Sequence, residues 1–259
     1  MLRLRKYPLR IEMLSFFFVI VLVILFTLLS PDYSFLYKEN IKNVLSMGPE
    51  LALIVLGVSI LMISGEFDLS VGSQLQFCMY IFITLLYAGV NDWASFLITV
   101  CVGAVLGFIN AVITIKGRIP SFITTLGTML LWRGVVYVAS GMMPIALRPY
   151  LPEYSLLKDI LVSEIFGVPI QIIWFGVIAL ILGLILHRHK FGNWIYATGD
   201  NPSAARAMGI NTTITKTICF MIVGVLSALV SVIQLYRIES FAATQGIGFE
   251  FKAIAACVL

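Results

Sequence analysis

Residues 51–73 read LALIVLGVSILMISGEFDLSVGS, and this stretch places an apolar segment directly against a polar one. No charged residue occurs from Leu51 to Ile63, and as a helix this part would be about 20 Å long. The SGEFDLSVGS that follows carries two carboxylates and two glycines, and another apolar run begins near residue 71. The stretch therefore predicts two apolar helices joined by a polar break.

The composition of the whole chain predicts an integral membrane protein. Of its 259 residues, 60% are hydrophobic and 12% are charged, with a mean hydropathy of +1.03. Globular proteins contain about a quarter of charged residues, so one soluble core cannot hide this excess of apolar side chains. Lipid leaves no partner for a free backbone group, and the alternating pattern of a barrel is absent. We therefore expect an all-α polytopic fold, a single transmembrane helix bundle over residues 1–259.

Seven complete spans and the start of an eighth are expected, because a helix needs about 20 residues to cross the hydrocarbon layer. The first apolar run ends in TLLSPDYS without a small-x-small cleavage site, so we interpret it as a span and not as a signal peptide. The predicted spans are 13–30, 43–64, 71–90, 94–115, 121–140, 169–187, 216–236 and an incomplete 251–259, with a polar loop at 188–215.

The distribution of basic residues predicts a cytoplasmic N-terminus. In that orientation ten basic residues are cytoplasmic and five lie on the other side, as the positive-inside rule requires. The ten are Arg3, Arg5, Lys6, Arg10, Lys116, Arg118, Arg188, Lys190, Arg206 and Lys216; the five are Lys38, Lys42, Arg148, Lys158 and Arg237.

The polar break at 64–73 has two interpretations. Asp68 or Ser70 could cap the start of the next helix. Alternatively, the break is an unwound or re-entrant turn at membrane depth, which proteins tolerate where it lines a cavity or pathway. Pro49, upstream of the break, is expected to bend the chain because it lacks a backbone donor.

Several polar residues at membrane depth form a candidate translocation pathway. Arg133 would lie about 20 Å along a helix counted from Pro120, and intramembrane arginines are usually paired. We expect its partner to be Glu66 or Asp68. Uncharged polar residues at this depth, Gln234 among them, either hydrogen-bond between helices or line the pathway. The candidate set is Glu66, Asp68, Ser70, Gln74, Gln76, Asn110 and Arg133.

The sequence lacks the motifs of the common enzyme classes. It contains no G-x-x-x-x-G-K-[ST] phosphate loop, no H-E-x-x-H motif and no evident nucleophile–base pair, and its cysteines occur singly. His187 and His189 are expected to complement a helix end and not to bind metal. We therefore expect no enzymatic activity, no metal site and no nucleic-acid partner. The G-x-x-x-G at Gly103 and Gly107 predicts a close helix contact within the chain.

The segment 196–210, YATGDNPSAARAMGI, predicts a short helix with well-defined ends. Asn201 is a good N-cap, Pro202 suits the first helical position, and Gly209 suits the position after the last turn. A helix of six or seven residues is marginal in water and must dock on something. Ala204, Ala205 and Met208 would form its apolar face, which meets either the chain's own bundle or a partner.

This segment resembles the cytoplasmic coupling segment of ribose-type permeases of ABC importers. Their pattern, A-x-G-x-N-x-x-A-A-x-x-x-G-I, is matched by Ala197, Gly199, Asn201, Ala204, Ala205, Gly209 and Ile210. SGEFDLSVGS is similar to the family's G-G-x-D-L-S-V-G-S, with Glu66 in place of its second glycine. IKGRIPSFITTLGTMLLWRG (115–134) and GFEFKAIAACVL (248–259) also resemble family segments, so the matches cover nearly the whole chain in order.

The resemblance implies a permease subunit of the bacterial inner membrane that carries a monosaccharide. A separate ATPase chain would bind ATP and Mg²⁺, so this chain would carry no cofactor. Further partners would be a second permease subunit, identical or different, and a periplasmic solute-binding protein. The implied coupling residues are Gly199, Asn201, Pro202, Ala204, Ala205, Arg206 and Gly209.

Some alternatives remain open from the sequence. The same machinery could carry an autoinducer-type furanone or a branched-chain amino acid. An ion-coupled secondary transporter also uses broken helices and buried charges, but the capped helix would then have no role. Family members continue through further helices, so the chain is expected to be incomplete at its C-terminal end.

Overall fold

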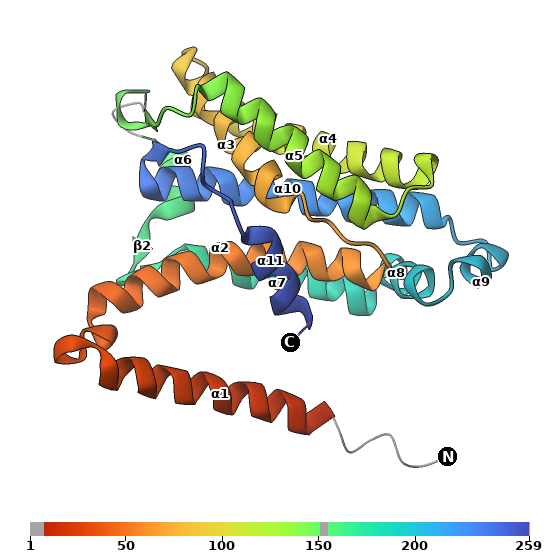
Figure 1. The fold of residues 1–259 in the computed structure, drawn as a ribbon, viewed down its shortest axis with the longest axis horizontal. Helices are drawn as coiled ribbons and strands as arrows, with labels where there is room; N and C mark the ends of the chain where they lie inside the picture. Colours follow the sequence, from red (N-terminus) through yellow and green to blue (C-terminus); the bar gives the residue numbers. More distant parts are fainter. Residues whose placement is uncertain (1–7, 151–154, 259) are drawn as a thin grey trace.

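The computed structural model describes residues 8–150 and 155–258 (Figure 1). The expected all-helical fold is confirmed, with small two-residue strands only in the connections that are described. The long helices are α1 (Pro8–Leu29), α2 (Lys38–Ile63), α3 (Val71–Tyr87), α4 (Asp92–Gly117), α5 (Ser121–Ser140), α7 (Gln171–Arg188) and α10 (Thr212–Ile238). The basic residues Arg3, Arg5 and Lys6, on which the orientation prediction partly depends, lie outside the described residues, as does Leu259.

Among the described residues, five helices are long and apolar enough to cross a membrane, namely α2, α4, α5, α7 and α10. Two shorter apolar helices accompany them: the Phe16–Leu29 part of α1, and α3. The main contact of α1 is with the 3-10 helix η1 (Pro31–Leu36), and Figure 1 shows α1 lying apart from the bundle. The count of seven complete spans stays a prediction.

Successive helices alternate in direction, which gives the bundle two distinct ends. One end, the α9 end, holds the turns after α2 and α4 and the short helices α8 (Lys190–Asp200) and α9 (Pro202–Ala207). The other, the α6 end, holds α6 (Leu156–Val162), the 3-10 helix η2 (Arg148–Tyr150) and the four strands. These strands form two antiparallel pairs, β1 (Ile145–Ala146) with β4 (Ser240–Phe241) and β2 (Glu164–Ile165) with β3 (Val168–Pro169).

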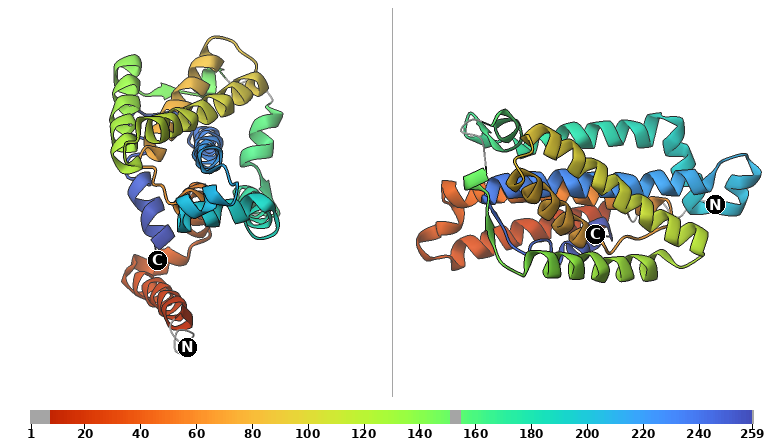
Figure 2. Two further views of the ribbon diagram at one scale, coloured as in Figure 1. Left: turned by 90° about the vertical axis from the view of Figure 1, so that its right-hand side faces the viewer. Right: turned by 90° about the horizontal axis from the view of Figure 1, so that it is seen from above.

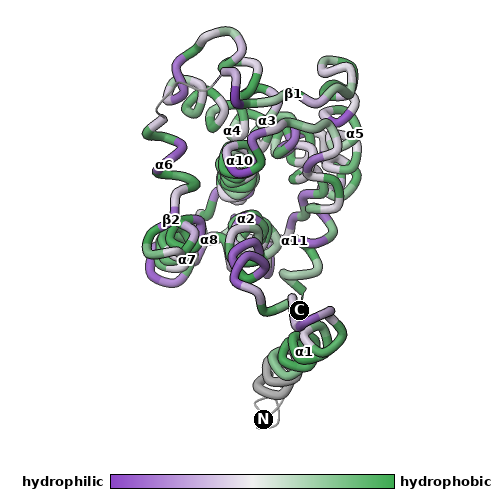
Figure 3. Tube along the Cα trace, turned by 90° about the vertical axis from the view of Figure 1, so that its left-hand side faces the viewer, coloured by the Kyte–Doolittle hydropathy of each residue, from purple (hydrophilic) through white to green (hydrophobic). Residues whose placement is uncertain are grey.

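Helix α10 lies at the centre of the bundle, where it contacts α2, α3 and α4 (Figures 2 and 3). Its contact with α4 is made through glycines. A Cβ on Gly107 would lie 2.2 Å from the carbonyl oxygen of Phe220, and one on Gly103 would lie 2.3 Å from that of Gly224. The predicted internal contact of the G-x-x-x-G motif is therefore confirmed.

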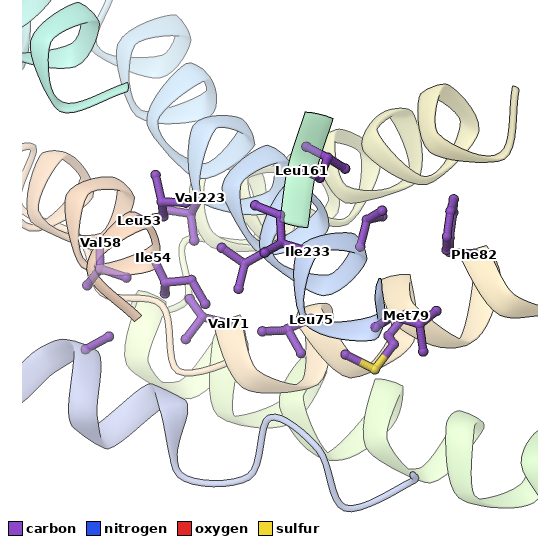
Figure 4. Packing of buried hydrophobic residues seen from close by; sticks show 14 of the residues in the cluster. Leu53, Ile54, Val58, Val71, Leu75, Met79, Phe82, Leu161, Val223 and Ile233 are labelled. Atoms are coloured by element: carbon purple, nitrogen blue, oxygen red, sulfur yellow. The ribbon is translucent and has the colours of Figure 1, made fainter. Parts of the chain in front are cut away.

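The apolar core fills the space between α10 and its neighbours. Figure 4 shows side chains of α2, α3 and α10 converging there. The fully buried members include Leu53, Ile54, Val58, Val71, Leu75, Met79, Val223 and Ile233. Because lipid is as apolar as these side chains, their close packing, and not their removal from water, holds the helices together.

Pro49 lies inside a helix, and the bend expected there stays a prediction. Helix α2 runs without interruption from Lys38 to Ile63 and includes Pro49. A proline removes one backbone donor and leaves the neighbouring hydrogen bonds in place, so tertiary contacts can hold such a helix together. One of these contacts is made by the adjacent Glu50, which is buried and paired with Arg237.

At the α6 end, Glu239 joins α10 to the connection before α6. Its carboxylate accepts a hydrogen bond of 2.6 Å from Lys158 Nζ and lies 3.5 Å from Arg148 Nε. Its backbone carbonyl accepts from Leu147 N at 2.9 Å. The Lys158 hydrogen bond lowers the pKa of the Glu239 carboxyl below its usual value.

Replacing Gly107 by alanine should destabilise the bundle, because the added methyl group meets backbone of α10 that cannot move aside. Overpacking of this kind costs about 1–3 kcal/mol. We expect a lower thermal unfolding midpoint in detergent for Gly107→Ala. The matched control is Gly127→Ala in α5, where the new Cβ has nothing within 4 Å. Equal midpoints for the two variants would contradict the close contact.

The stabilising effect of Glu239 should depend on pH in one direction. A group whose pKa is lowered by folding stabilises fully above the ordinary glutamate pKa of about 4.3, and this contribution is lost as pH falls through the folded value. The unfolding midpoints of wild type and Glu239→Gln should therefore differ near neutral pH and converge in acid. The difference should be small, under about 1 kcal/mol for an exposed pair, and smaller still in a Lys158→Met background. A difference that does not change with pH would refute the assignment.

Candidate functional site

The turn between α2 and α3, residues 64–70, is held by a buried carboxylate. Asp68 is fully buried and accepts hydrogen bonds from Ser70 N at 2.7 Å, from Ser70 Oγ at 2.6 Å and from Gln74 Nε2 at 2.9 Å. Ser70 occupies the N-cap position of α3, but its side chain makes no capping hydrogen bond. The side chains of the turn therefore bind one another, and the capping interpretation is wrong for Ser70.

The same turn is tied to α4 and α5. Asn110 Nδ2 donates to Ser70 Oγ at 2.8 Å and to Asp68 Oδ2 at 3.3 Å, and its own Oδ1 accepts from Thr128 at 2.8 Å. Thr125 Oγ1 accepts from Leu69 N at 3.0 Å. Asn110 precedes the end of α4 by seven residues, which corresponds to about 10 Å of helix. The 68–70 part of the turn is therefore recessed into the bundle and covered by protein, whereas Gly65 and Phe67 are exposed.

Glu66 connects this turn to the start of α10. Its carboxylate lies 2.5 Å from Lys216 Nζ, and both side chains are largely buried. Nearby, a Cβ on Gly199 would lie 1.8 Å from the carbonyl oxygen of Ile63. Gly199 therefore lets α8 pack directly against the end of α2, which explains why the coupling segment has glycine at this position.

The expected pairing of Arg133 with Glu66 or Asp68 is wrong. Arg133 Nη2 lies 3.5 Å from Glu250 Oε1, in the first turn of α11 (Phe249–Val258). Glu66 is paired with Lys216, and Asp68 is satisfied by uncharged donors. Glu250 was not predicted as the partner, because the predicted span begins only at residue 251 and the connection before it was not assigned a place in the bundle.

That connection, residues 239–248, brings the chain back into the bundle after α10 ends. Gln76 Nε2 donates to the carbonyl oxygen of Ala243, and a Cβ on Gly72 would lie 2.2 Å from that of Gly246. Gly246 and Gly248 both have positive φ, 82° and 84°, and permit the reversal. Their pattern, Gly-Ile-Gly, was the available sequence signal. Helix α11 thus begins at the depth of Arg133, and transporters build solute sites from such discontinuous helices.

Several buried polar atoms of α3, α5 and α11, those of Arg133 and Glu250 among them, have unused hydrogen-bonding capacity. The two side chains are only 16% and 3% exposed. Within the described part of the chain, four such buried atoms lack a hydrogen-bond partner: Gln74 Oε1, Gln76 Oε1, Arg133 Nε and Glu250 Oε2. These helices therefore carry both unused donors and unused acceptors.

A third largely buried ion pair lies at the α6 end and was not predicted. Arg237 donates to both oxygens of Glu50, from Nε at 2.6 Å and from Nη2 at 2.9 Å. This bidentate geometry satisfies the carboxylate completely, whereas the Arg133–Glu250 contact is a single longer one. The Glu50–Arg237 pair thus fastens α2 to α10.

Helix α9 has the ends that its sequence predicts. Asn201 Oδ1 accepts from Ser203 N at 3.1 Å and Ala204 N at 3.0 Å, Pro202 opens the helix, and Gly209 follows it with φ 84°. The expected apolar face is divided, because Ala205 is buried against the molecule whereas Met208 is 70% exposed. Ala204 and Arg206 are also exposed.

Helix α8 was not predicted as a separate element. The loop at 188–215 contains it, and His189 Nδ1 accepts from Phe191 N as its N-cap. His189 therefore caps the start of α8. It also directly follows α7, whose last turn contains His187. Ile195 and Thr198 of α8 are buried, which fixes α8 on the bundle, and α9 packs against α8.

Comparisons with known proteins agree on one family. The family model described as branched-chain amino acid transport system / permease component matches residues 40–259. Ribose import permease protein RbsC of Escherichia coli (strain K12) is 32% identical over 248 residues, which is 96% of this chain and 76% of that protein. Autoinducer 2 import system permease protein LsrC of Salmonella paratyphi B (strain ATCC BAA-1250 / SPB7) is 33% identical over 229 residues, 88% of this chain and 64% of that protein. The solved structures gave no match.

Replacing Asp68 by asparagine should destabilise the recessed turn. The amide keeps the shape, but its NH₂ group would face the donors of Ser70, Gln74 or Asn110 and leave at least one of them unpaired. An unsatisfied buried group costs about 1–3 kcal/mol, so we expect a lower unfolding midpoint. The control is Asp159→Asn, the same change at an exposed position of α6. If Asp68→Asn is no less stable than the control, the carboxylate does not hold the turn.

Proposed function

The chain belongs to the family described as branched-chain amino acid transport system / permease component, and on this premise we propose that it is the permease subunit of an ATP-driven ABC importer of a monosaccharide. Its relatives include permeases whose names specify import of ribose and of autoinducer 2. It is a membrane transport subunit and not an enzyme. ATP and Mg²⁺ would bind a separate ATPase chain, because this sequence has no phosphate loop.

The assembled importer would contain three kinds of partner. A second permease subunit, identical or different, completes the pathway; ATPase subunits bind at the cytoplasmic face; and a periplasmic solute-binding protein delivers the cargo. Seven complete spans in the bacterial inner membrane, with the N-terminus in the cytoplasm, place the α9 end at the cytoplasmic face. This orientation is supported by six basic residues at the α9 end: Lys116, Arg118, Arg188, Lys190, Arg206 and Lys216.

Helix α9 is the element that the ATPase would contact. Its side chains Ala204 and Arg206 are exposed, as is Met208 directly after it, and the buried Ala205 anchors it to the bundle. Gly209 to Asn211 connect it directly to α10, the central helix, and Arg206 Nη1 lies 3.4 Å from Thr212 Oγ1. A displacement of α9 by closure of the ATPase would therefore act on the helix that contacts α2, α3 and α4. The observation that carries the proposal is this short helix, capped at both ends and exposed on one face.

The solute would pass near Arg133, Gln76 and Glu250. A monosaccharide presents hydroxyl groups that both donate and accept, and each of these three side chains has a buried polar atom without a partner in the described chain. Asp68, Ser70, Gln74 and Asn110 would border the same pathway as a fixed wall, since they hold the recessed turn through hydrogen bonds among themselves. Glu66 would couple that wall to α10 through Lys216.

An autoinducer-type furanone is a second candidate cargo, supported by the similarity to LsrC, whose identity is close to that of the ribose relative. It is also a small polyhydroxylated molecule and would use the same donors and acceptors. A branched-chain amino acid is a weaker candidate. An ion-coupled secondary transporter would leave the exposed face of α9 without a role.

The coupling role of α9 predicts a difference between two matched methionine variants. Met208 after α9 is 70% exposed, and Met143 at the α6 end is 69% exposed. The variant Met208→Glu should disrupt an apolar contact with the ATPase. We expect it to reduce the amount of ATPase that co-purifies with the full-length permease by about tenfold. Met143→Glu should leave co-purification unchanged.

The two variants also test the orientation. Loss of the ATPase in Met143→Glu with retention in Met208→Glu would mean that the α6 end is cytoplasmic. Retention in both variants would reject α9 as the docking element and favour the secondary transporter. Gel filtration of each variant establishes that the permease remains folded.

A further inference from the structure

An open polar cavity of about 400 Å³ lies at the α9 end and shares only Glu66 with the candidate pathway. It is bordered by the last turn of α4, the turn before α5, helix α9 and the first turns of α10. Its lining includes Glu66, Thr114, Arg118, Arg206, Thr212 and Lys216. A cavity of this size accommodates a small ligand.

The charged groups of the cavity leave an excess of positive charge. Three cations and one carboxylate line it, and Lys216 is paired with Glu66. In the part of the chain that the structure describes, neither Arg118 nor Arg206 forms an ion pair. Two guanidinium groups from different elements therefore border one cavity without a carboxylate of their own.

The uncharged hydrogen-bond donors of the cavity, like its positive charge, favour an anionic ligand. The hydroxyl of Thr114 is buried and has no hydrogen-bond partner among the described residues, although its residue lines the cavity. Thr212 and Thr213 open α10, a helix of 27 residues, and also line the cavity. The first N–H groups of a helix and its dipole favour an anion. The helix start and the residues of the two guanidinium groups thus border one pocket, and Thr114, with its unpartnered hydroxyl, is part of the same wall.

We propose that this cavity binds a phosphate group, held by Arg118 and Arg206 with Thr114 as an additional hydrogen-bond donor. Guanidinium groups bind phosphate in a bidentate manner, and hydroxyl groups of threonine donate to its remaining oxygens. Phosphate from two sources has this chemistry, an anionic phospholipid headgroup and a free phosphate in solution. The site does not depend on the proposed transport function. A phosphate bound there bridges α9 to the turn after α4 and so restrains α9.

The test measures phosphate binding by the full-length protein in nanodiscs of two compositions. In neutral phosphatidylcholine discs, equilibrium dialysis with radiolabelled inorganic phosphate measures the free anion. In discs that also contain phosphatidylglycerol, native mass spectrometry measures the anionic lipid retained on the protein. The variants are Arg118→Gln and Thr114→Val, and the control is Arg188→Gln, an exposed arginine at the same end outside the cavity.

We expect binding in at least one arm, weakened about tenfold or more by Arg118→Gln and less strongly by Thr114→Val, with Arg188→Gln within about twofold of wild type. Binding in the first arm identifies a free phosphate; binding in the second arm alone identifies a lipid headgroup. Thr114→Val removes one hydroxyl at nearly constant volume, so a folding defect in Arg118→Gln does not prevent the test. No binding in either arm, or equal losses in Arg118→Gln and Arg188→Gln, overturns the proposal and leaves the cavity to a carboxylate of a partner protein.

Discussion

The contact between α4 and α10 through Gly103, Gly107 and Gly224 is the constraint on which the rest of the structure depends. With no side chain between them, the two backbones approach so closely that a Cβ on Gly224 would lie 2.0 Å from the carbonyl oxygen of Gly103. This approach places α10 at the centre, where α2 and α3 can also reach it. Lys216 and Arg237, near its two ends, are then positioned to meet Glu66 and Glu50. They are separated by 21 residues of helix, or about 31 Å, which is close to the thickness of the hydrocarbon layer.

The buried charges of the bundle differ in how completely they are satisfied, and the proposed pathway role rests on this difference. Removing charges from water is costly unless geometry and additional hydrogen bonds compensate. Arg237 and Glu50 meet this condition through two short hydrogen bonds, and Asp68 meets it through uncharged donors. Arg133 and Glu250 share one contact of 3.5 Å and keep Nε and Oε2 without partners in the described chain. An incompletely satisfied pair at the start of a discontinuous helix is the arrangement that a passing solute can use.

Local signals in the sequence predicted what local physics decides. Apolar run lengths predicted the long helices, the glycine spacing predicted the α4–α10 contact, and Asn201, Pro202 and Gly209 predicted both ends of α9. The partner of Arg133, Glu250, lies 117 positions later in the chain. It could not be predicted, because its position depends on how residues 239–248 re-enter the bundle. Helix α8 was missed because its apolar residues, among them Ile195, are interrupted by polar ones and are buried only through contact with other helices. The burial of Ala205 and the exposure of Met208 likewise depend on the contact between α9 and α8. The sequence of residues 202–208 alone does not show which side of the helix makes that contact.

The two places where helices are interrupted touch each other, and this contact joins the α9 end to the candidate pathway. The turn at 64–70 leads into Gly72, whose carbonyl oxygen would lie 2.3 Å from a Cβ on Gly246. Four residues after Gly246 comes Glu250, the partner of Arg133, and six residues before Gly72 comes Glu66, the partner of Lys216. A shift of the first turns of α10, caused by movement of α9, would act on Glu66, then on the recessed turn, and then on the 239–248 segment. Energetic coupling travels through contiguous packed groups of this kind. Because both glycines contact backbone atoms, neither segment can move at this point without displacing the other.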